Sequence, residues 1–539
     1  MPRPLLRRSA LFVSLFLFAV APPSPAMQQN ASTIRILVNG DPAILVPQWT
    51  ANTDEQRIGE VLFLKLAGFG GSSSGDRSAT PAIARSWKRR DSLTLVFELD
   101  PRARWHDGKP VTMDDVLYSF ARARDSKVSP GQAPLLRQIT DVRAEDAKHV
   151  VITFAEPYDE QLYDATHHVP ILPAHLLSSL PQDGLASTPF AQAPVGSGAY
   201  RFVRRQAGQF VELAAVPNHF LGKPGIGRVI FVVAGDQEAR VNLLLGGGAD
   251  VMTEFIPPLG NLQRLNGRAD VATMRVPTYS VVYLLFNQRD RADRTAPHPI
   301  LSDPEVRRAL TLATDRATIV QAVYGGYAEI ASAPISLASW VRTAMPPQVP
   351  FDTAEARRVL ASRGWTDHDG DGVLDKDGRP LALSLNYPTN SAPRTAVGAI
   401  VQQQWKRLGV RVDLAGTEGA TWGDRRRRGD FDVDISSATQ DPSPSGLVQS
   451  WSCAGFTASN VGYYCNPQVD TLIARARRAT GDSRSAWGQV LSTIAGDYPA
   501  VFMYQIQSVV AYRPAAARPD VRPESYWSTL PRWQPGGGR

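Results

Sequence analysis

The stretch WHDGKPVTMDDVLYSF (residues 105–120) places a histidine beside one aspartate and upstream of two more. His106, Asp114 and Asp115 are residue types that can perform acid–base chemistry or bind a metal ion. The local pattern also gives the aspartates structural roles. Thr112, followed three residues later by Asp115, resembles a capping box, and carboxylates in a first helical turn are favoured by the helix dipole. We therefore expect a turn and a capped helix here, without catalysis.

A second pattern with chemical potential is GSSSG at residues 71–75, which matches the G-x-S-x-G nucleophile motif with Ser73 at its centre. That motif needs a strand–turn–helix elbow, whereas the surrounding residues predict a loop. A secreted serine hydrolase that uses Ser73 and one of the eight histidines is nevertheless kept as the alternative function.

A third pattern is DHDGDGVLDKDG at residues 367–378, which resembles the first half of a calcium-binding loop. Gly378 stands where such a loop has its closing glutamate. Asp-Gly repeats also form tight turns without a metal ion. Calcium binding by Asp367–Asp375 stays open, and we predict no metal site and no cofactor.

The N-terminus has the pattern of a secretory signal peptide. Three arginines precede an apolar run at residues 11–21, and Ser24 and Ala26 supply the small residues of a cleavage site. The run is too short to span a bilayer, and a retained anchor is the alternative. We predict a cleaved signal at residues 1–26 and an exported, soluble periplasmic protein. The formal net charge of +7 is mild for 539 residues and does not indicate nucleic-acid binding.

Cys453 and Cys465 are the two cysteines of the chain. In an exported protein, two nearby cysteines predict one disulfide, and two free thiols are the alternative. These residues are too few for a zinc site.

Strand and helix patterns alternate through the second half of the chain, which favours α/β units with a mostly parallel sheet. One strand there, FDVDISSA, leads into TQDPSPSG, where Asp441 follows the strand end. Trp422 and Trp451 lie nearby in sequence. An acid among aromatic residues at a strand end is typical of a small-ligand site in such folds, and a turn residue is the alternative.

Six segments together resemble one known family, the family 5 extracellular solute-binding proteins of ABC importers, which include oligopeptide-, dipeptide- and nickel-binding proteins. The resemblance extends in order over some 450 residues and is carried by six segments: PAIARSWKRRDSLTLVFELDPRARWHDGKPVTMDDVLYSF, PVGSGAYRF, FNQ with SDPEVRRALTLATDRATIVQAVYGG, GWTDHDGDGVLDKDGRPLALSLNY, GDFDVDI with DP, and NPQVDTLIARAR.

The resemblance implies an α/β fold with two lobes, the type II periplasmic-binding-protein fold in its large three-subdomain form, with a hinge and an interlobe cleft. The hinge crossings are expected after YLLFNQ and near YPAVFMYQIQSVVAY. The expected divisions are a main subdomain of lobe I at 27–58, 194–286 and 500–539, a peripheral subdomain of lobe I at 59–193, and lobe II at 287–499.

The resemblance also implies a function. The chain is expected to capture a peptide or a similar amine-bearing solute and to deliver it to a membrane permease powered by a separate ATPase subunit. No enzyme activity, no nucleic-acid partner and a monomeric state are expected. An Asp at the position of Asp441 pairs with the ligand's α-ammonium in peptide-binding members. Trp422, Trp451 and Tyr504 are predicted aromatic walls, with core packing as the alternative for each. Sugars, opines and nickel complexes are alternative ligands.

Overall fold

The computed structural model describes residues 32–50, 52–69, 78–129, 132–180, 184–255, 259–439, 442–457, 459–523 and 525–537. Three predictions fall on other residues: the signal peptide at 1–26, Ser73 and Asp441 all lie outside the described residues. In the described part of the chain, no helix is long and apolar enough to cross a membrane.

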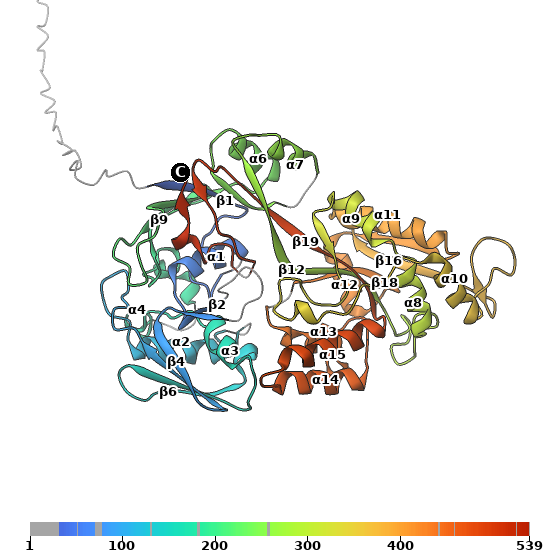
Figure 1. Cartoon of the computed structure of the whole chain (residues 1–539), viewed down its shortest axis with the longest axis horizontal. Helices are drawn as coiled ribbons and strands as arrows, with labels where there is room; N and C mark the ends of the chain where they lie inside the picture. The colour runs from blue at the N-terminus through green and yellow to red at the C-terminus, as the bar shows by residue number, and fades with distance from the viewer. Residues whose placement is uncertain are drawn as a thin grey trace, which may run out of the picture.

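One large mixed sheet runs through the molecule (Figure 1). Its spatial order is β17 (Arg411–Thr417), β16 (Ala382–Pro388), β18 (Val433–Thr439), β12 (Ala272–Phe286), β19 (Ala500–Tyr512), β11 (Val251–Phe255), β1 (Thr33–Val38), β10 (Arg228–Val233), β9 (Phe210–Ala215) and β8 (Tyr200–Gln206), with β13 (Ala328–Ile330) also paired with β19.

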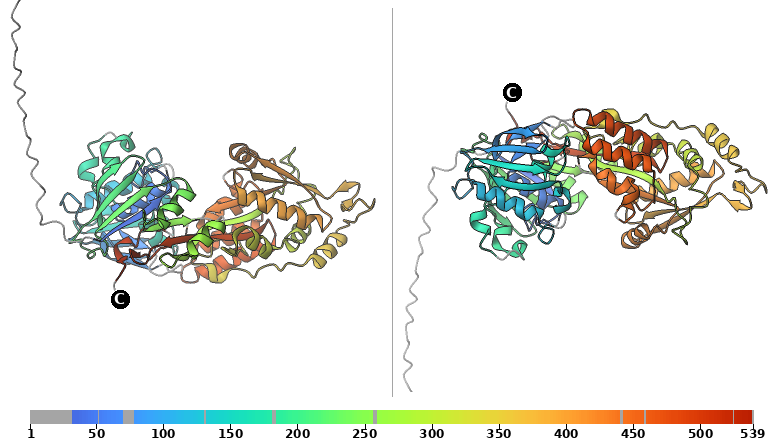
Figure 2. Two further views of the ribbon diagram at one scale, coloured as in Figure 1. Left: turned by 90° about the horizontal axis from the view of Figure 1, so that it is seen from above. Right: turned by 90° about the horizontal axis from the view of Figure 1, so that it is seen from below.

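Two long strands, β12 and β19, join two bodies that lie side by side (Figures 1 and 2). Each strand contributes to both bodies. Val276 of β12 packs into a core of the first body, whereas β12 from Val281 onward packs into cores of the second. On β19 the change falls between Tyr504 and Val509. The β12–β19 ladder is also irregular between Pro277 and Val281, so the crossing lies within the strands.

The direction of the strands differs in part from the expectation of a mostly parallel sheet in the second half. β16 is parallel to β17 and to β18, as predicted. β12, however, is antiparallel to both β18 and β19. The chain enters the second body along β12 and leaves it along β19 through the same junction, and the two strands therefore run in opposite directions.

A separate four-stranded antiparallel sheet belongs to the first body: β4 (Ala84–Asp91), β5 (Thr94–Leu99), β7 (His149–Phe154) and β6 (Ile139–Ala144). Helix α2 (Met113–Arg124) packs against β6 and β7. The other helices of the first body are α1 (Thr53–Leu62), α3 (Gln161–His167), α4 (Ala174–Leu177), α5 (Pro189–Gln192), α6 (Gln237–Leu245) and α7 (Leu259–Asn266), with the short helix η2 (Ala133–Leu136) and strands β2 (Ala67–Phe69) and β3 (Ala79–Pro81).

The second body carries most of its helices on the faces of the large sheet (Figure 2). They are α8 (Pro304–Leu312), α9 (Arg316–Tyr324), α10 (Thr353–Ser362), α11 (Ala392–Lys406), α12 (Gly419–Arg428), η5 (Pro444–Gly446), α13 (Leu447–Trp451), α14 (Pro467–Arg478) and α15 (Ser483–Gly496). Local sequence explains several boundaries. Asp303 caps α8 by accepting from the backbone N–H of Glu305, and Gly325 ends α9 with a φ of 55°.

The aspartates and the histidine of residues 105–120 are structural, as predicted. Asp115 accepts from the backbone N–H of Thr112 at 2.8 Å, from Trp105 Nε1 at 3.1 Å and from the backbone N–H of Ala174 at 2.8 Å. His106 lies between two backbone groups: Gly196 N–H donates to Nδ1, and Nε2 is 2.9 Å from the Gly198 oxygen. Burial lowers the pKa of His106 to about 4, so the ring is neutral at pH 7.

The disulfide loop and the Asp-Gly loop also have the local structure that the sequence indicates. The sulfur atoms of Cys453 and Cys465 lie 2.08 Å apart and form the predicted disulfide. The carboxylates of Asp367, Asp369 and Asp371 cluster on an exposed loop, where each accepts hydrogen bonds from nearby backbone N–H groups. Turn formation thus accounts for these aspartates.

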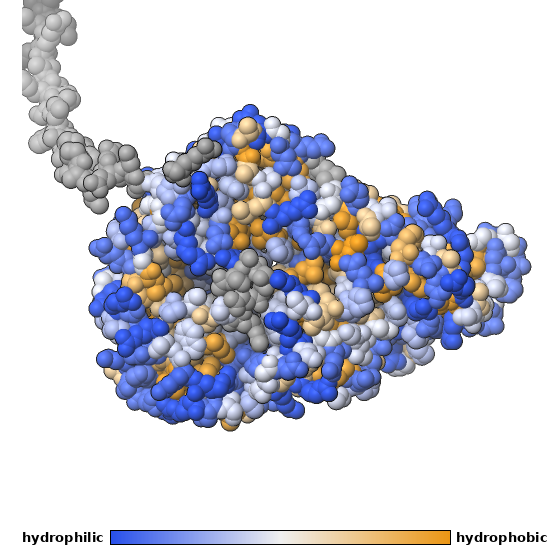
Figure 3. Space-filling model, in the orientation of Figure 1, coloured by the Kyte–Doolittle hydropathy of each residue, from blue (hydrophilic) through white to orange (hydrophobic). Residues whose placement is uncertain are grey.

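The surface face in Figure 3 is predominantly hydrophilic, and its apolar residues occur in separate patches.

Candidate functional site

The candidate site is a cavity between the two bodies, with a volume of about 370 Å³. Leu135 lines it from the first body, and most of the remaining wall comes from the second. Thr439 at the end of β18 and Ser443 before η5 both line it. The lining residues are Leu135, Tyr283, Ile335, Arg426, Ser437, Ala438, Thr439, Ser443, Pro444, Gly446, Leu447, Gln449, Ser450, Trp451 and Ser459.

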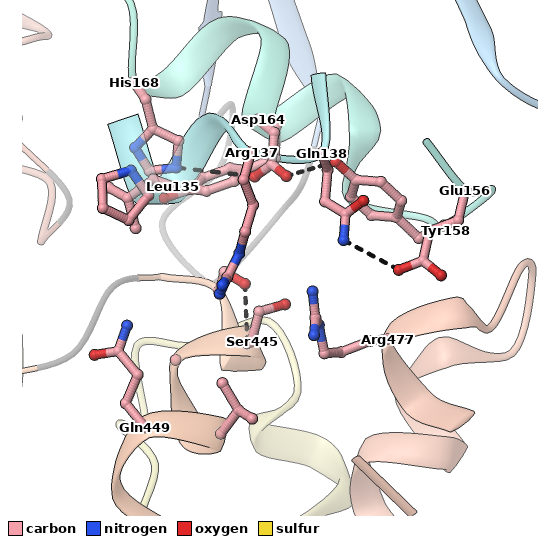
Figure 4. Close-up of a pocket in the computed structure, with 15 residues that line it drawn as sticks. Leu135, Arg137, Gln138, Glu156, Tyr158, Asp164, His168, Ser445, Gln449 and Arg477 are labelled. Carbon is pink, nitrogen blue, oxygen red and sulfur yellow. Dashed lines mark hydrogen bonds and ion pairs between the residues drawn. The ribbon is translucent and has the colours of Figure 1, made fainter. Parts of the chain in front are cut away.

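A second, outer cavity adjoins the first, because Leu135, Ser443, Gly446 and Gln449 line both. Figure 4 shows its two sides, with η2 and α3 of the first body above and α13 and α14 of the second below. The two cavities together form a continuous space between the bodies, which we call the interlobe cleft.

A buried polar cluster supports the wall of the inner cavity. The Asp434 carboxylate, fully buried on β18, accepts from Asn386 Nδ2 at 2.7 Å and Trp422 Nε1 at 2.8 Å and from the hydroxyl of Ser436. Arg426 Nε lies 3.5 Å from the same carboxylate. Burial raises the pKa of Asp434 above its usual value, and these donors and Arg426 oppose that rise. The cluster fixes the position of Arg426, which lines the cavity.

Trp451, a predicted wall residue, lines the inner cavity while most of its side chain is buried. It is 2% exposed and packs edge-on against Tyr283 and Phe502 with centroids 5.5 Å apart in each pair. Trp451 therefore both lines the cavity and packs in the core of the second body.

The other two predicted aromatic residues lie behind the wall. Trp422 donates to Asp434, and the Arg394 guanidinium lies 4.9 Å from its ring centroid. Tyr504 is 0% exposed, and its hydroxyl is 3.3 Å from that of Tyr324. Neither residue lines the inner or the outer cavity. Their contact with a ligand stays a prediction, and the geometry of Tyr504 favours core packing.

Glu160, at the start of α3, links the two bodies through three hydrogen bonds. Its carboxylate accepts from Ser443 Oγ and Ser445 Oγ, each at 2.6 Å, and from Trp340 Nε1 at 3.2 Å. All three donors belong to the second body, and two of them flank the turn that follows Asp441. This carboxylate therefore connects the first body directly to the wall of the cleft.

Two neighbouring acids extend this contact. Glu156 accepts from Arg478 Nε at 2.7 Å, and Asp159 accepts from the backbone N–H of Gly481 at 3.1 Å and from the hydroxyl of Ser483. Together with Glu160 they form a row of carboxylates, which we call the acidic latch (Glu156, Asp159 and Glu160).

No sequence pattern predicts the acidic latch. AEPYDE (residues 155–160) has the composition of an ordinary polar loop, and its partners lie about 180 to 330 residues later in the chain. Only the relative placement of the two bodies brings these groups together.

Comparison with known proteins decides the family. The model of the bacterial extracellular solute-binding proteins, family 5, matches residues 78–458. The chain belongs to this family. The serine-hydrolase alternative gains no support from it.

Individual relatives are distant but extend along most of the chain. The oligopeptide-binding protein AppA of Bacillus subtilis is 26% identical over 445 residues, which is 78% of this chain and 77% of AppA. A probable di/tripeptide-binding protein 5 of Pseudomonas aeruginosa is 27% identical over 504 residues, covering 87% and 89% of the two chains.

Solved structures share the fold. AppA in complex with a nonapeptide has a TM-score of 0.71 at 22% identity, covering 94% of this chain and 99% of AppA. NikZ from Campylobacter jejuni in complex with Ni(L-His) has a TM-score of 0.73 at 22% identity over the same shares. The two-lobed periplasmic-binding-protein fold predicted from the sequence is thus confirmed.

Proposed function

We propose that this chain is the periplasmic receptor of an ABC importer and that it captures peptides or similar amine-bearing solutes in the interlobe cleft. It delivers them, as a monomer and without catalysis, to a membrane permease powered by an ATPase subunit. A cleaved signal at residues 1–26 exports it. The family match and the peptide-binding relatives support the general role.

The observation that supports the proposal is that Thr439 and Ser443, described residues on either side of Asp441 in the sequence, both line the inner cavity. A carboxylate at Asp441 has an α-ammonium as its natural partner, since a cation taken out of water needs a counter-charge. Trp451 supplies an apolar surface in the same cavity, with Trp422 and Tyr504 as further predicted contacts.

Lobe I is proposed to consist of a main subdomain at residues 27–58, 194–286 and 500–539 and a peripheral subdomain at residues 59–193. Lobe II is proposed to consist of residues 287–499. The core membership of β12 and β19 supports hinge points a few residues inside these limits, near 277–280 and 505–508. Rotation there would open the cleft while leaving both cores intact.

The decisive experiment is a calorimetric and thermal-shift screen of the purified mature protein. Probes are di-, tri- and pentapeptides of alanine, the same peptides with acetylated N-termini, simple sugars and a nickel–histidine chelate. We expect binding to a free peptide, about tenfold or more weaker binding after acetylation, and loss of that preference in Asp441→Asn. Asp424→Asn, an exposed aspartate on α12, is the control. A response to sugar or chelate but to no peptide would refute the peptide proposal.

A further inference from the structure

A third cavity lies in the first body, where β2 meets α3 and the C-terminal part of the chain (Figure 1). Its walls also include the end of α1 and the strand β3. Among the described residues, none from the second body lines it, and it shares no lining residue with the inner or the outer cavity. Its volume is about 160 Å³, the size of a cavity that holds one small organic molecule.

We propose that this cavity, which we call the first-body pocket, binds a small anion that carries hydroxyl groups, with Lys65 and Arg532 as its cationic contacts. The anionic group is a carboxylate or a phosphate, because both pair with an ammonium and a guanidinium in the same way. The inference goes beyond the proposed function and does not depend on it, since it concerns a second site outside the interlobe cleft.

Lys65 presents an ammonium group that the protein itself leaves largely unused. Within the described part of the chain this group makes no hydrogen bond, and the Glu60 oxygen Oε1 is 3.9 Å away. The side chain of Lys65 is nevertheless only 21% exposed. The other oxygen of Glu60 accepts from Ser525 Oγ at 2.6 Å, so this acid already has a closer partner. An enclosed ammonium whose acid is bonded elsewhere is a ready partner for an anion.

The backbone around Lys65 is held in place by its neighbours. The Lys65 carbonyl accepts from the N–H of Ile83 at 3.2 Å, and the Leu64 carbonyl accepts from the N–H of Ile171 at 2.9 Å. The ammonium therefore extends from a fixed segment, and a ligand has little backbone to order when it binds.

Arg532 brings a second cation to the same wall. It ends the short helix η7 (Leu530–Arg532), and its N–H donates to the Thr529 carbonyl at 2.8 Å. Its side chain pairs with Asp520 at 3.5 Å, and the exposed fractions of the two side chains are 57% and 44%. Because water screens so exposed a contact, guanidinium donors are left for a ligand.

His167 lines the pocket without adding charge to it. Burial, together with Lys65 and His168, holds the pKa of His167 well below its usual value, so its ring is neutral near pH 7. The described residues that line the pocket thus include two cations and one acid, and the acid is already hydrogen-bonded. The pocket therefore favours an anion.

Hydroxyl groups and apolar side chains define the rest of the ligand. Among the described residues, Thr80 Oγ1 has no hydrogen-bond partner. Ser528 Oγ donates to the Ser525 carbonyl at 3.0 Å, which leaves its lone pairs available as acceptors. Phe63 and Ala82 supply apolar surface to the same pocket. A short carbon chain that carries hydroxyl groups and one anionic group matches this set of contacts.

The test compares small probes that differ in charge and in hydroxyl content. Calorimetry with the mature protein measures the affinities of glycerate, glycerol 3-phosphate, inorganic phosphate and neutral glycerol. The variants are K65M, which keeps the length of the side chain, K65R, which keeps its charge, and R532Q. K88M is the matched control, because Lys88 lies exposed on β4 outside the pocket. Thermal unfolding checks that each variant is folded.

We expect glycerate or glycerol 3-phosphate to bind about tenfold or more tightly than glycerol, and less tightly as salt is added. K65M and R532Q should each weaken this binding about tenfold, whereas K65R and K88M should stay within about threefold of the wild type. NMR of the histidine rings reports the location. The ring signal of His167, assigned with His167→Gln, should shift on binding, and that of His168, which lines the outer cavity, should not.

The tighter of the two hydroxylated anions identifies the anionic group as a carboxylate or a phosphate. Equal binding of glycerol and the anions, or inorganic phosphate bound as tightly as glycerol 3-phosphate, would overturn the proposed ligand class. Binding that survives both K65M and R532Q, that shifts His168 instead of His167, or that alanine tripeptide displaces would place the anion elsewhere and overturn the pocket. No binding of any probe also overturns it, and leaves peptide capture, which is tested with Asp441→Asn, unaffected.

Discussion

Removing the Glu160 carboxylate should shift the protein toward an open arrangement. Glu160 is buried at the junction, and its carboxylate accepts from Trp340, Ser443 and Ser445 of the second body. When the bodies separate, water replaces these three bonds. Each therefore contributes only its net value to closure, about 1 kcal/mol.

Three such bonds amount to about 3 kcal/mol in the closing equilibrium, or about 100-fold. Because a ligand that binds the closed arrangement must supply any lost closing energy, Glu160→Ala should weaken its apparent affinity by up to this factor. Glu160→Gln keeps one acceptor oxygen, and its apparent ligand affinity should be about tenfold weaker than that of the wild type. Small-angle X-ray scattering without ligand should show a larger radius of gyration for both variants.

Glu145→Ala is the matched control, since Glu145 belongs to the same body and pairs with exposed Arg90 rather than across the junction. Its scattering profile and ligand affinity should equal those of the wild type. Thermal unfolding of every variant checks that the cores are intact. If Glu160→Ala matches Glu145→Ala in scattering and in affinity within about twofold, the three bonds do not hold the bodies together and the reasoning is wrong.

Three further results are expected. His106 has a pKa of about 4 in the folded protein, whereas in the unfolded chain it takes up a proton below about pH 6.5. The free energy of unfolding should therefore fall by up to about 3 kcal/mol as the pH drops from 6.5 to 4. Denaturant titrations of His106→Gln should show a shallower fall over this pH range, and a fall equal to that of the wild type would contradict the reasoning. Replacing Cys453 and Cys465 by serine opens a loop with a sequence separation of 12 and should lower the free energy of unfolding by about 3 kcal/mol, whereas an unchanged denaturation midpoint would show that the bond adds no stability. Trp451→Ala should lower the free energy of unfolding by about 3–5 kcal/mol because the ring is buried, and it should also weaken ligand binding. Tyr504→Phe should leave the ligand affinity unchanged if the Tyr504 ring only packs in the core. Calorimetric measurement of ligand affinity, at a temperature where both variants are folded, separates the roles of the two residues.

The sequence predicted most of what depends on neighbouring residues. The cap of α2 and the turn at Asp367–Asp371 follow from residue types a few positions apart, and the structure has them where the sequence indicated them. The role of His106 as a structural residue also followed, because the turn and helix around it left no catalytic partner in the local pattern. Such features need no knowledge of the rest of the fold, since their hydrogen bonds close within a short segment.

The division of the molecule into lobes stays a prediction. The sequence places one crossing after YLLFNQ, at the end of β12, whereas the residues of β12 change from one core to another near residues 277–280. Both parts of β12 are apolar, and a continuous apolar strand does not indicate which core it enters. The antiparallel placement of β12 beside β18 likewise depends on the route of the whole chain.

What the sequence determined by itself was the family and the fold, because recurring motifs and local patterns carry that information, whereas a ligand contact at Asp441 stays a prediction. What only the tertiary structure decided was the cleft. Glu160 and Trp340 are 180 positions apart and Glu156 and Arg478 are 322 positions apart, yet each pair meets across the junction. The physical reason is that a cleft between two bodies is built from side chains whose only relation is the orientation of those bodies. The two bodies are joined through β12 and β19, and no pattern near the cleft residues themselves specifies how the bodies are oriented.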